Sequence, residues 1–373
     1  MREPPSDFDP EGAPRTEAPT VPLAGLVRAK ARVAHPMRHW YIAATSAEIT
    51  RGPVSSTVLG VPMVVFRDGA GRAGALLDRC PHRNVPLSDG AVVEGALECP
   101  YHGWRFDTGG HCKHIPCLDG PVGDARARDA TAFPTEEHDG FVWVCPTPGA
   151  TPALPPYRFR LLGAPGYDTV HQVVEAPGSL YATAENALDV PHTAFLHRGL
   201  FRSQSRGIRI EAVVRRQGHT VACEYLGEPR PPGVIGRLLS PSGGTVTHFD
   251  RFVAPCVAEV EYRIGEENHL LVATAMTPVS DFVTRLYAVV SFRLRVPHAA
   301  VKAALKPLAL KIFQQDAVVL GRMTEAVKRF GGEQFASTEL DVLGKHIWRL
   351  LRAAERDEPF SDELLEERVT LLL

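Results

Sequence analysis

The sequence predicts an α+β protein, with an N-terminal all-β domain and a C-terminal domain in which helices flank an antiparallel sheet. Three observations support this prediction. Short apolar runs broken by Gly, Pro and Asp fill residues 34–146, which is typical of closely spaced strands and turns. Alternating segments between residues 206 and 296 indicate one antiparallel sheet. Helical spacing follows over residues 299–330 and 342–357.

The length of 373 residues favours two domains over a single core. Residues 1–25 are rich in Pro and acidic residues and lack the apolar region of a signal peptide, so we expect a disordered tail. The Pro-rich stretch TPGATPALPPYRFR indicates a domain seam. We therefore expect a first domain over residues 26–155 and a second over 156–373.

Composition excludes several classes of protein. A formal net charge of −2 argues against a nucleic-acid binder, which would carry a basic face. Seven cysteines, an odd number, do not form the framework of a secreted disulfide-rich protein and fit a reducing cytoplasm. No apolar run reaches the 18 or more residues of a membrane span. The chain also lacks the glycine-rich signatures of nucleotide-binding sites.

Two Cys–His pairs lie in the first domain, where each is expected at the tip of a β-hairpin. Cys80 and His82 form C-x-H, and Cys99 and His102 form C-x-x-H. Structural zinc sites usually repeat one ligand type in each half, whereas each pair here mixes thiolate with imidazole. The mixed order favours a 2Fe-2S cluster with both Cys on one iron and both His on the other. A zinc site remains the alternative.

The second domain begins with a predicted strand, TVHQVVEA, and a predicted helix, SLYATAENALDV, for which Ser179 is a plausible N-cap. The motif D-x-x-H-x-x-x-x-H follows, formed by Asp189, His192 and His197. Non-haem iron(II) oxygenases bind their metal through two His and one carboxylate. On a straight helix the two His would point about 140° apart, so Pro191 is expected to break the helix before His192.

The motif C-x-H-x16-C-x-x-H, followed by GWRFD and by GFVWV, resembles the Rieske domain of Rieske non-haem iron oxygenases. The later motif resembles the iron-binding helix of the same family, in which His192 and His197 would bind a mononuclear iron. The resemblance implies a helix-grip catalytic domain and a third ligand from a C-terminal helix. Asp316, a lone carboxylate in an apolar helical stretch, fits that role. Glu325 and Asp281 are weaker candidates.

The resemblance also implies an assembly and an activity. In a ring-shaped homotrimer, the cluster of one subunit would meet the iron of its neighbour, and Asp189 would link ligands of the two sites. Electrons would come from NAD(P)H through a separate flavin or iron–sulfur reductase, directly or by way of a ferredoxin. The chain would be the cytoplasmic terminal oxygenase component and would use dioxygen as co-substrate.

Length and layout most resemble the monooxygenase branch, which includes enzymes like vanillate demethylase, pheophorbide oxygenase and aminopyrrolnitrin oxygenase. The implied substrate is a ring-bearing, largely apolar small molecule that is hydroxylated, demethylated, desaturated or N-oxidised. Candidate pocket residues are Phe249, Phe252, Tyr262 and Phe313. The competing interpretation is a non-catalytic Rieske protein that only carries electrons.

Overall fold

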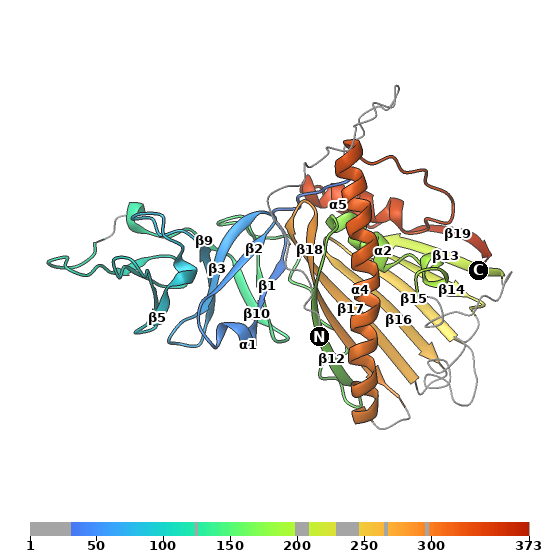
Figure 1. Cartoon of the computed structure of the whole chain (residues 1–373), viewed down its shortest axis with the longest axis horizontal. Helices are drawn as coiled ribbons and strands as arrows, with labels where there is room; N and C mark the ends of the chain where they lie inside the picture. The colour runs from blue at the N-terminus through green and yellow to red at the C-terminus, as the bar shows by residue number, and fades with distance from the viewer. Residues whose placement is uncertain are drawn as a thin grey trace, which may run out of the picture.

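A computed structural model describes residues 31–123, 126–197, 209–228, 246–264, 268–294 and 298–372. The predicted tail at 1–25 lies outside these residues. The described chain forms three small antiparallel sheets followed by one large sheet with helices against it (Figure 1). The predicted fold class is therefore confirmed.

The regular secondary structure of the N-terminal part is mainly short β-strands. Its sheets have the strand orders β1-β11-β10, β2-β3-β4-β9 and β5-β6-β7-β8. The elements are β1 (Tyr41–Thr45), α1 (Ser46–Ile49), β2 (Val54–Val58), β3 (Val61–Arg67), β4 (Ala73–Leu77), β5 (Ala91–Val93), β6 (Ala96–Glu98), β7 (Arg105–Phe106), β8 (Cys112–His114), β9 (Ala132–Phe133), β10 (Thr135–His138) and β11 (Phe141–Val144), with 3-10 helices at Leu87–Asp89 and Arg126–Arg128.

The C-terminal part is built on an eight-stranded antiparallel sheet in the order β12-β18-β17-β16-β15-β14-β13-β19. Its elements are β12 (Asp168–Ala176), α2 (Leu180–Ala187), a 3-10 helix (Pro191–Ala194), β13 (Arg209–Gln217), β14 (Thr220–Leu226), β15 (Val246–Val253), β16 (Val257–Ile264), β17 (Asn268–Ser280), β18 (Val283–Arg293), α4 (His298–Phe330), α5 (Gly344–Glu355) and β19 (Leu365–Leu372). The last strand was not predicted; it pairs with β13 at the edge of the sheet.

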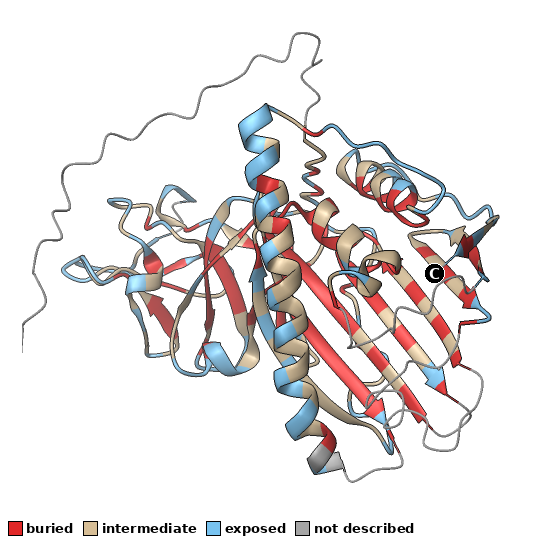
Figure 2. Cartoon of the chain, turned by 45° about the vertical axis from the view of Figure 1, so that its right-hand side comes forward, coloured by how far each residue is buried: buried red, intermediate tan, exposed pale blue. Residues whose placement is uncertain are grey.

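Helices α2 and α4 lie against the face of the sheet that bears the candidate iron site. The predicted N-cap is confirmed, since the Ser179 hydroxyl accepts a hydrogen bond from the Ala182 N–H at 3.2 Å. The 33-residue helix α4 crosses the sheet obliquely (Figure 2). In the described part of the chain, no helix is both long and apolar enough to span a membrane.

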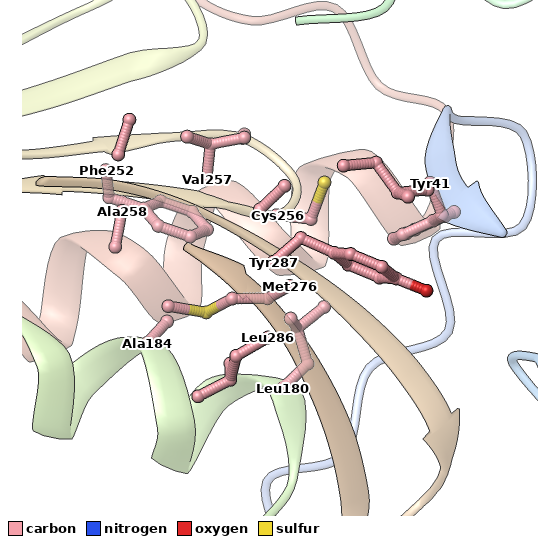
Figure 3. Packing of buried hydrophobic residues seen from close by; sticks show 14 of the residues in the cluster. Tyr41, Leu180, Ala184, Phe252, Cys256, Val257, Ala258, Met276, Leu286 and Tyr287 are labelled. Atoms are coloured by element: carbon pink, nitrogen blue, oxygen red, sulfur yellow. The ribbon is translucent and has the colours of Figure 1, made fainter. Parts of the chain in front are cut away.

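The two parts of the chain share a hydrophobic core and are joined by hydrogen bonds. Tyr41 of β1 packs into the same buried cluster as Tyr287 of β18 and Cys256, which lies in the turn between β15 and β16 (Figure 3). At the seam, the Thr277 hydroxyl donates to the carbonyl of Ile42 at 2.7 Å. The N-terminal part is therefore seated firmly on one end of β17.

Candidate metal centres and cavity

The two Cys–His pairs lie in loops with closely similar backbones. The carbonyl of Cys80 accepts from the N–H of Asn84 at 2.9 Å, and that of Cys99 accepts from the N–H of Gly103 at 3.0 Å. Both fourth residues have positive φ, 65° at Asn84 and 68° at Gly103, a conformation that Asn and Gly tolerate best. The loop containing Cys99 joins β6 to β7 as the predicted hairpin, whereas the loop containing Cys80 follows β4 and leads into irregular chain.

The four predicted cluster ligands gather at the tip of these loops. The thiols of Cys80 and Cys99 are buried at 2% and 3% exposure, while the rings of His82 and His102 lie 4.6 Å apart between centroids. Burial and the neighbouring Cys99 raise the pKa of the Cys80 thiol to about 11. A bound metal would replace the proton on such a thiol.

The surroundings of the two imidazoles fit an iron–sulfur cluster. Trp104 stacks on His82 with centroids 4.7 Å apart and an interplanar angle of 6°. The Nδ1 atom of His82 is buried and has no hydrogen-bond partner among the described residues. An orphaned ring nitrogen, beside a second imidazole and two buried thiols, is a donor set suited to a mixed Cys–His cluster.

A second donor set forms where the D-x-x-H-x-x-x-x-H segment meets α4. The Nε2 atoms of His192 and His197 lie 3.2 Å apart, and they are 3.6 and 3.1 Å from Oδ1 of Asp316. Ligands at right angles on a metal, with bonds of about 2.1 Å, stand about 3 Å apart. The triangle of atoms therefore fits one face of a mononuclear metal ion.

The local chain explains how both imidazoles reach one point. α2 ends at Ala187, and Pro191 begins a separate 3-10 helix that carries His192. His197 follows this turn and is buried at 2% exposure. The predicted break before His192 therefore lies at residues 188–190, directly before Pro191, and it turns both rings towards α4.

The Nδ1 atom of each imidazole has a hydrogen-bond partner. The His197 Nδ1–H donates to Oε1 of Gln315 at 2.9 Å, and the His192 Nδ1–H donates to the carbonyl of Asp189. These bonds fix the tautomer and leave both Nε2 lone pairs directed at Asp316, as a metal site requires. Gln315 was not predicted, although it directly precedes Asp316 in the sequence.

Charges at this site are compensated by one another. Burial opposes the charged form of His192, but Asp189 and Asp316 outweigh it and raise its pKa to about 9. Burial would raise the pKa of Asp316, yet the adjacent imidazoles of His192 and His197 outweigh burial and lower it. Oδ1 of Asp316 is buried and lacks a well-formed hydrogen bond. A divalent cation would satisfy this carboxylate oxygen.

A cavity of about 350 Å³ begins at this donor set. It lies between α2, α4 and the strands β12, β16, β17 and β18. Its described walls are mostly aliphatic, and His192, His197 and Asp316 lie at one part of its lining. A ligand in the cavity would contact apolar walls while facing a metal.

Two of the four predicted pocket residues line this cavity, namely Tyr262 and Phe313. The other two do not. Phe249 pairs with Glu261 on the opposite face of the sheet and lies under the Arg251 guanidinium. Phe252 is on the cavity side but is fully buried in the shared core. The strand containing both was identified, but its facing and depth could not be read from its residues.

One buried polar cluster was missed. The His248 imidazole donates from Nδ1 to Glu228 at 2.6 Å and from Nε2 to Asp250 at 3.0 Å. Its ring stacks on that of Tyr262 at 4.1 Å between centroids. His248 on β15 lies directly opposite Tyr262 on β16. The cluster therefore packs against the Tyr262 ring from the strand next to the cavity wall. The alternation of His248 and Asp250 along β15 was the only signal for it in the sequence.

Comparisons with known proteins agree with this arrangement. Residues 39–133 match the Rieske [2Fe-2S] domain family, and residues 178–357 match the vanillate O-demethylase oxygenase C-terminal domain family. The oxygenase component of chloroacetanilide N-alkylformylase from Rhizorhabdus wittichii is 30% identical over 323 residues, covering 82% of this chain and 90% of that protein.

Other relatives are matched over shorter stretches. The oxygenase component of dicamba O-demethylase from Stenotrophomonas maltophilia is 36% identical over 162 residues, which span 43% of this chain and about half, 47%, of that protein. The crystal structure of dicamba monooxygenase bound to 3,6-dichlorosalicylic acid has a TM-score of 0.74 at 24% identity, covering 87% of this chain and 98% of that one. This last likeness concerns the fold.

Proposed function

This chain belongs to the Rieske non-haem iron oxygenase components, and from that premise we propose that it is the terminal oxygenase of a monooxygenase system acting on a ring-bearing, largely apolar small molecule. The observation that carries the proposal is the convergence of His192, His197 and Asp316 on one wall of an aliphatic cavity. The names of relatives include an O-demethylase and an N-alkylformylase. These names favour the oxidative removal of a group from oxygen or nitrogen. Hydroxylation, desaturation and N-oxidation are the alternative reactions.

Two sets of residues would hold the cofactors. Cys80, His82, Cys99 and His102 would bind the 2Fe-2S cluster, whereas the mononuclear iron would be bound by His192, His197 and Asp316. When bound, the cluster supplies electrons one at a time and the iron supplies reductive activation of dioxygen.

The chain's own side chains have three tasks in this scheme. Gln315 and the carbonyl of Asp189 hold the two imidazoles as Nε2 donors. The aliphatic walls exclude water and orient the substrate towards Asp316 and its neighbours. The Asp189 carboxylate accepts from the backbone N–H of His192 at 3.2 Å and lies 3.4 Å from its Nδ1, so it would couple the iron site to an approaching cluster.

The partners follow from the same proposal. We expect a homotrimer in which the cluster of one subunit approaches Asp189 of the next, and a separate NAD(P)H-dependent reductase, with or without a ferredoxin, as electron source. We further propose a cytoplasmic location and units at residues 26–155 and 156–373, preceded by the tail at 1–25.

Metal content provides the direct test. Protein purified under argon should be red-brown and contain three irons and two acid-labile sulfides per chain. His197→Ala should lose one iron and retain the cluster absorption. A non-catalytic electron carrier would hold two irons, and a zinc-stapled protein would be colourless and free of sulfide.

Activity is tested with a surrogate reductase and NADH. Aryl methyl ethers and N-alkyl anilides should stimulate oxygen uptake in the wild type and not in His197→Ala. Iron-loaded protein that shows no substrate-dependent oxygen uptake with any of these compounds would contradict the proposed reaction.

A further inference from the structure

The charge of the cavity wall restricts the substrate class. Among the described residues that line the cavity there is no Lys or Arg. Apart from the donor set, the only described charged residue in the lining is Glu175, whose carboxylate binds Arg285 at 2.7 Å. Glu175 alternates along β12 with the cavity residues Val174 and Ala176, so its side chain leaves the cavity.

Strand alternation places the charges on the other face of the sheet. On β16, Ala258, Val260 and Tyr262 line the cavity, whereas Glu259, Glu261 and Arg263 alternate with them. The buried carboxylate of Glu261 binds Arg251 at 2.5 Å and Arg263 at 2.6 Å on that opposite face. These guanidinium groups are therefore separated from the cavity by the sheet itself.

Helix α4 sorts its charges in the same way. Leu305, Leu308 and Ile312 line the cavity, while Lys306 and Lys311 are exposed. These two lysines thus occupy the outer side of the helix. Lys302, nearer the start of the helix, does not line the cavity and binds the carboxylate of Asp168 at 2.6 Å. The wall that a ligand would contact along α4 is aliphatic as far as Asp316.

One cation does lie on the cavity side of the sheet, but it is already paired. His248 lies behind Tyr262 and donates to both Glu228 and Asp250. The cluster therefore offers no spare positive charge to a ligand. A bound metal is no substitute, because a carboxylate ligated there would take the open positions on which the proposed reaction depends.

Cavity size sets the second restriction. An aliphatic cavity of about 150 Å³ holds one benzene ring. The cavity here, about 350 Å³, has room for two rings. Its described uncharged polar groups, such as Asn186 and Thr274, could serve a single hydrogen-bonding group on the ligand.

Resting on the proposed oxygenase function, we propose that the substrate is an uncharged bicyclic compound, and that the site discriminates against ring carboxylates. A buried carboxylate needs a cation to compensate its charge, and the described lining offers no Lys or Arg, only uncharged donors such as Thr183 and Asn186. This sets the chain apart from relatives whose printed names refer to benzoates, such as the 3-chlorobenzoate-3,4-dioxygenase oxygenase subunit of Comamonas testosteroni.

The charge restriction is tested by equilibrium dialysis of the oxidised holoenzyme with 2-methoxynaphthalene and with 6-methoxy-2-naphthoate. The neutral ether should bind with a Kd at least about tenfold lower than that of the acid, since each tenfold step is only 1.4 kcal/mol and an unpaired carboxylate costs more. Equal or tighter binding of the acid overturns the proposal, as does failure of the ether to bind up to its solubility limit.

The size restriction is tested with a matched pair on α4. Ala309→Phe fills the cavity and should weaken binding of 2-methoxynaphthalene at least about tenfold, while anisole is affected less. Ala303→Phe adds the same ring on the exposed side of the helix and should change neither Kd. Equal effects of the two variants would place the ligand outside this cavity and refute the assignment.

These binding measurements need neither electrons nor dioxygen. They therefore test the substrate class independently of the proposed oxygenase function. Tight binding of the neutral ether to a protein without mononuclear iron would leave the substrate class standing and contradict the oxygenase. Normal iron content and substrate-dependent oxygen uptake, with preference for the acid, would support the oxygenase and contradict the proposed substrate class.

Discussion

At the scale of single residues, the proposed iron site would depend on a hydrogen bond that the ligand motif does not include. Gln315 accepts from the Nδ1–H of His197 and so keeps the Nε2 atom directed at Asp316. Gln315→Leu should lower iron affinity about 10–100-fold, because the ring loses both its tautomer and its orientation. The ratio of iron to acid-labile sulfide, measured after dialysis against a weak chelator, reports this loss.

The neighbouring glutamine offers the control for this prediction. Gln314 is exposed on the same helix, so Gln314→Leu should retain the full ratio. If the two variants lose iron equally, the effect comes from the helix and the hydrogen bond has no special part in it.

The second residue-scale prediction concerns pH and His248. Burial opposes its charged form, but Asp250 and Glu228 outweigh burial and raise its pKa to about 9. The folded pKa exceeds the unfolded value of about 6.5, so the contribution to the free energy of unfolding is complete below about pH 6.5. It should be lost as pH rises through about 9, with a total on the order of 3 kcal/mol.

Urea unfolding between pH 6 and 10 checks this prediction. His248→Gln keeps a hydrogen-bond donor but cannot ionise, so its stability should be lower at pH 6 and should fall less towards pH 9 than that of the wild type. Parallel curves for the two proteins would show that His248 does not titrate in this range.

At the scale of elements, periodicity predicted α2, α4, α5 and most strands but not the short helix α1, and local spacing identified the candidate metal ligands. The strand β19 was missed because LEERVTLL has three consecutive charged residues near its start and follows a helix, so it lacks the alternation that would reveal a buried face. The sequence also did not show which side chains of β15 point to the cavity side. Alternation defines two faces of a strand but not which of them meets the core. Gln315 and His248 act through contacts between distant segments, and spacing alone does not reveal such contacts.

Adjacent leucines on β19 test how this strand docks. Leu371 is fully buried in the shared core, whereas Leu372 is 70% exposed. Leu371→Ala should lower the free energy of unfolding by about 2–5 kcal/mol through lost packing and a residual cavity. Leu372→Ala should stay within about 0.5 kcal/mol of the wild type. Chemical denaturation of both variants decides, and similar losses would mean that the strand does not dock in this register.

At the scale of the whole molecule, the proposed homotrimer would bring the cluster of one subunit to the iron site of the next, and Asp189 is where this proposal can be tested. Asp189→Asn preserves the shape of the side chain and the backbone carbonyl that binds His192. It removes the charge 3.4 Å from the Nδ1 of His192. We expect turnover about 10–100-fold lower, with cluster absorption and iron content unchanged.

Stopped-flow oxidation of the reduced cluster, in the presence of substrate and dioxygen, locates the defect. Slow cluster oxidation in Asp189→Asn would agree with an electron route through this residue. Oxidation and product formation at the wild-type rate would remove Asp189 from that route.

The strand β17 has a consequence for protein engineering. Its cavity-facing residues Leu270, Val272 and Thr274 form part of the wall, while Thr277 and Pro278, further along the same strand, hold the N-terminal part by hydrogen bonds to Ile42 and Leu59. A library that diversifies the first three positions would reshape substrate scope while leaving the joint between the two parts unaltered. The boundary between adaptable and fixed positions therefore runs across a single strand, at Met276.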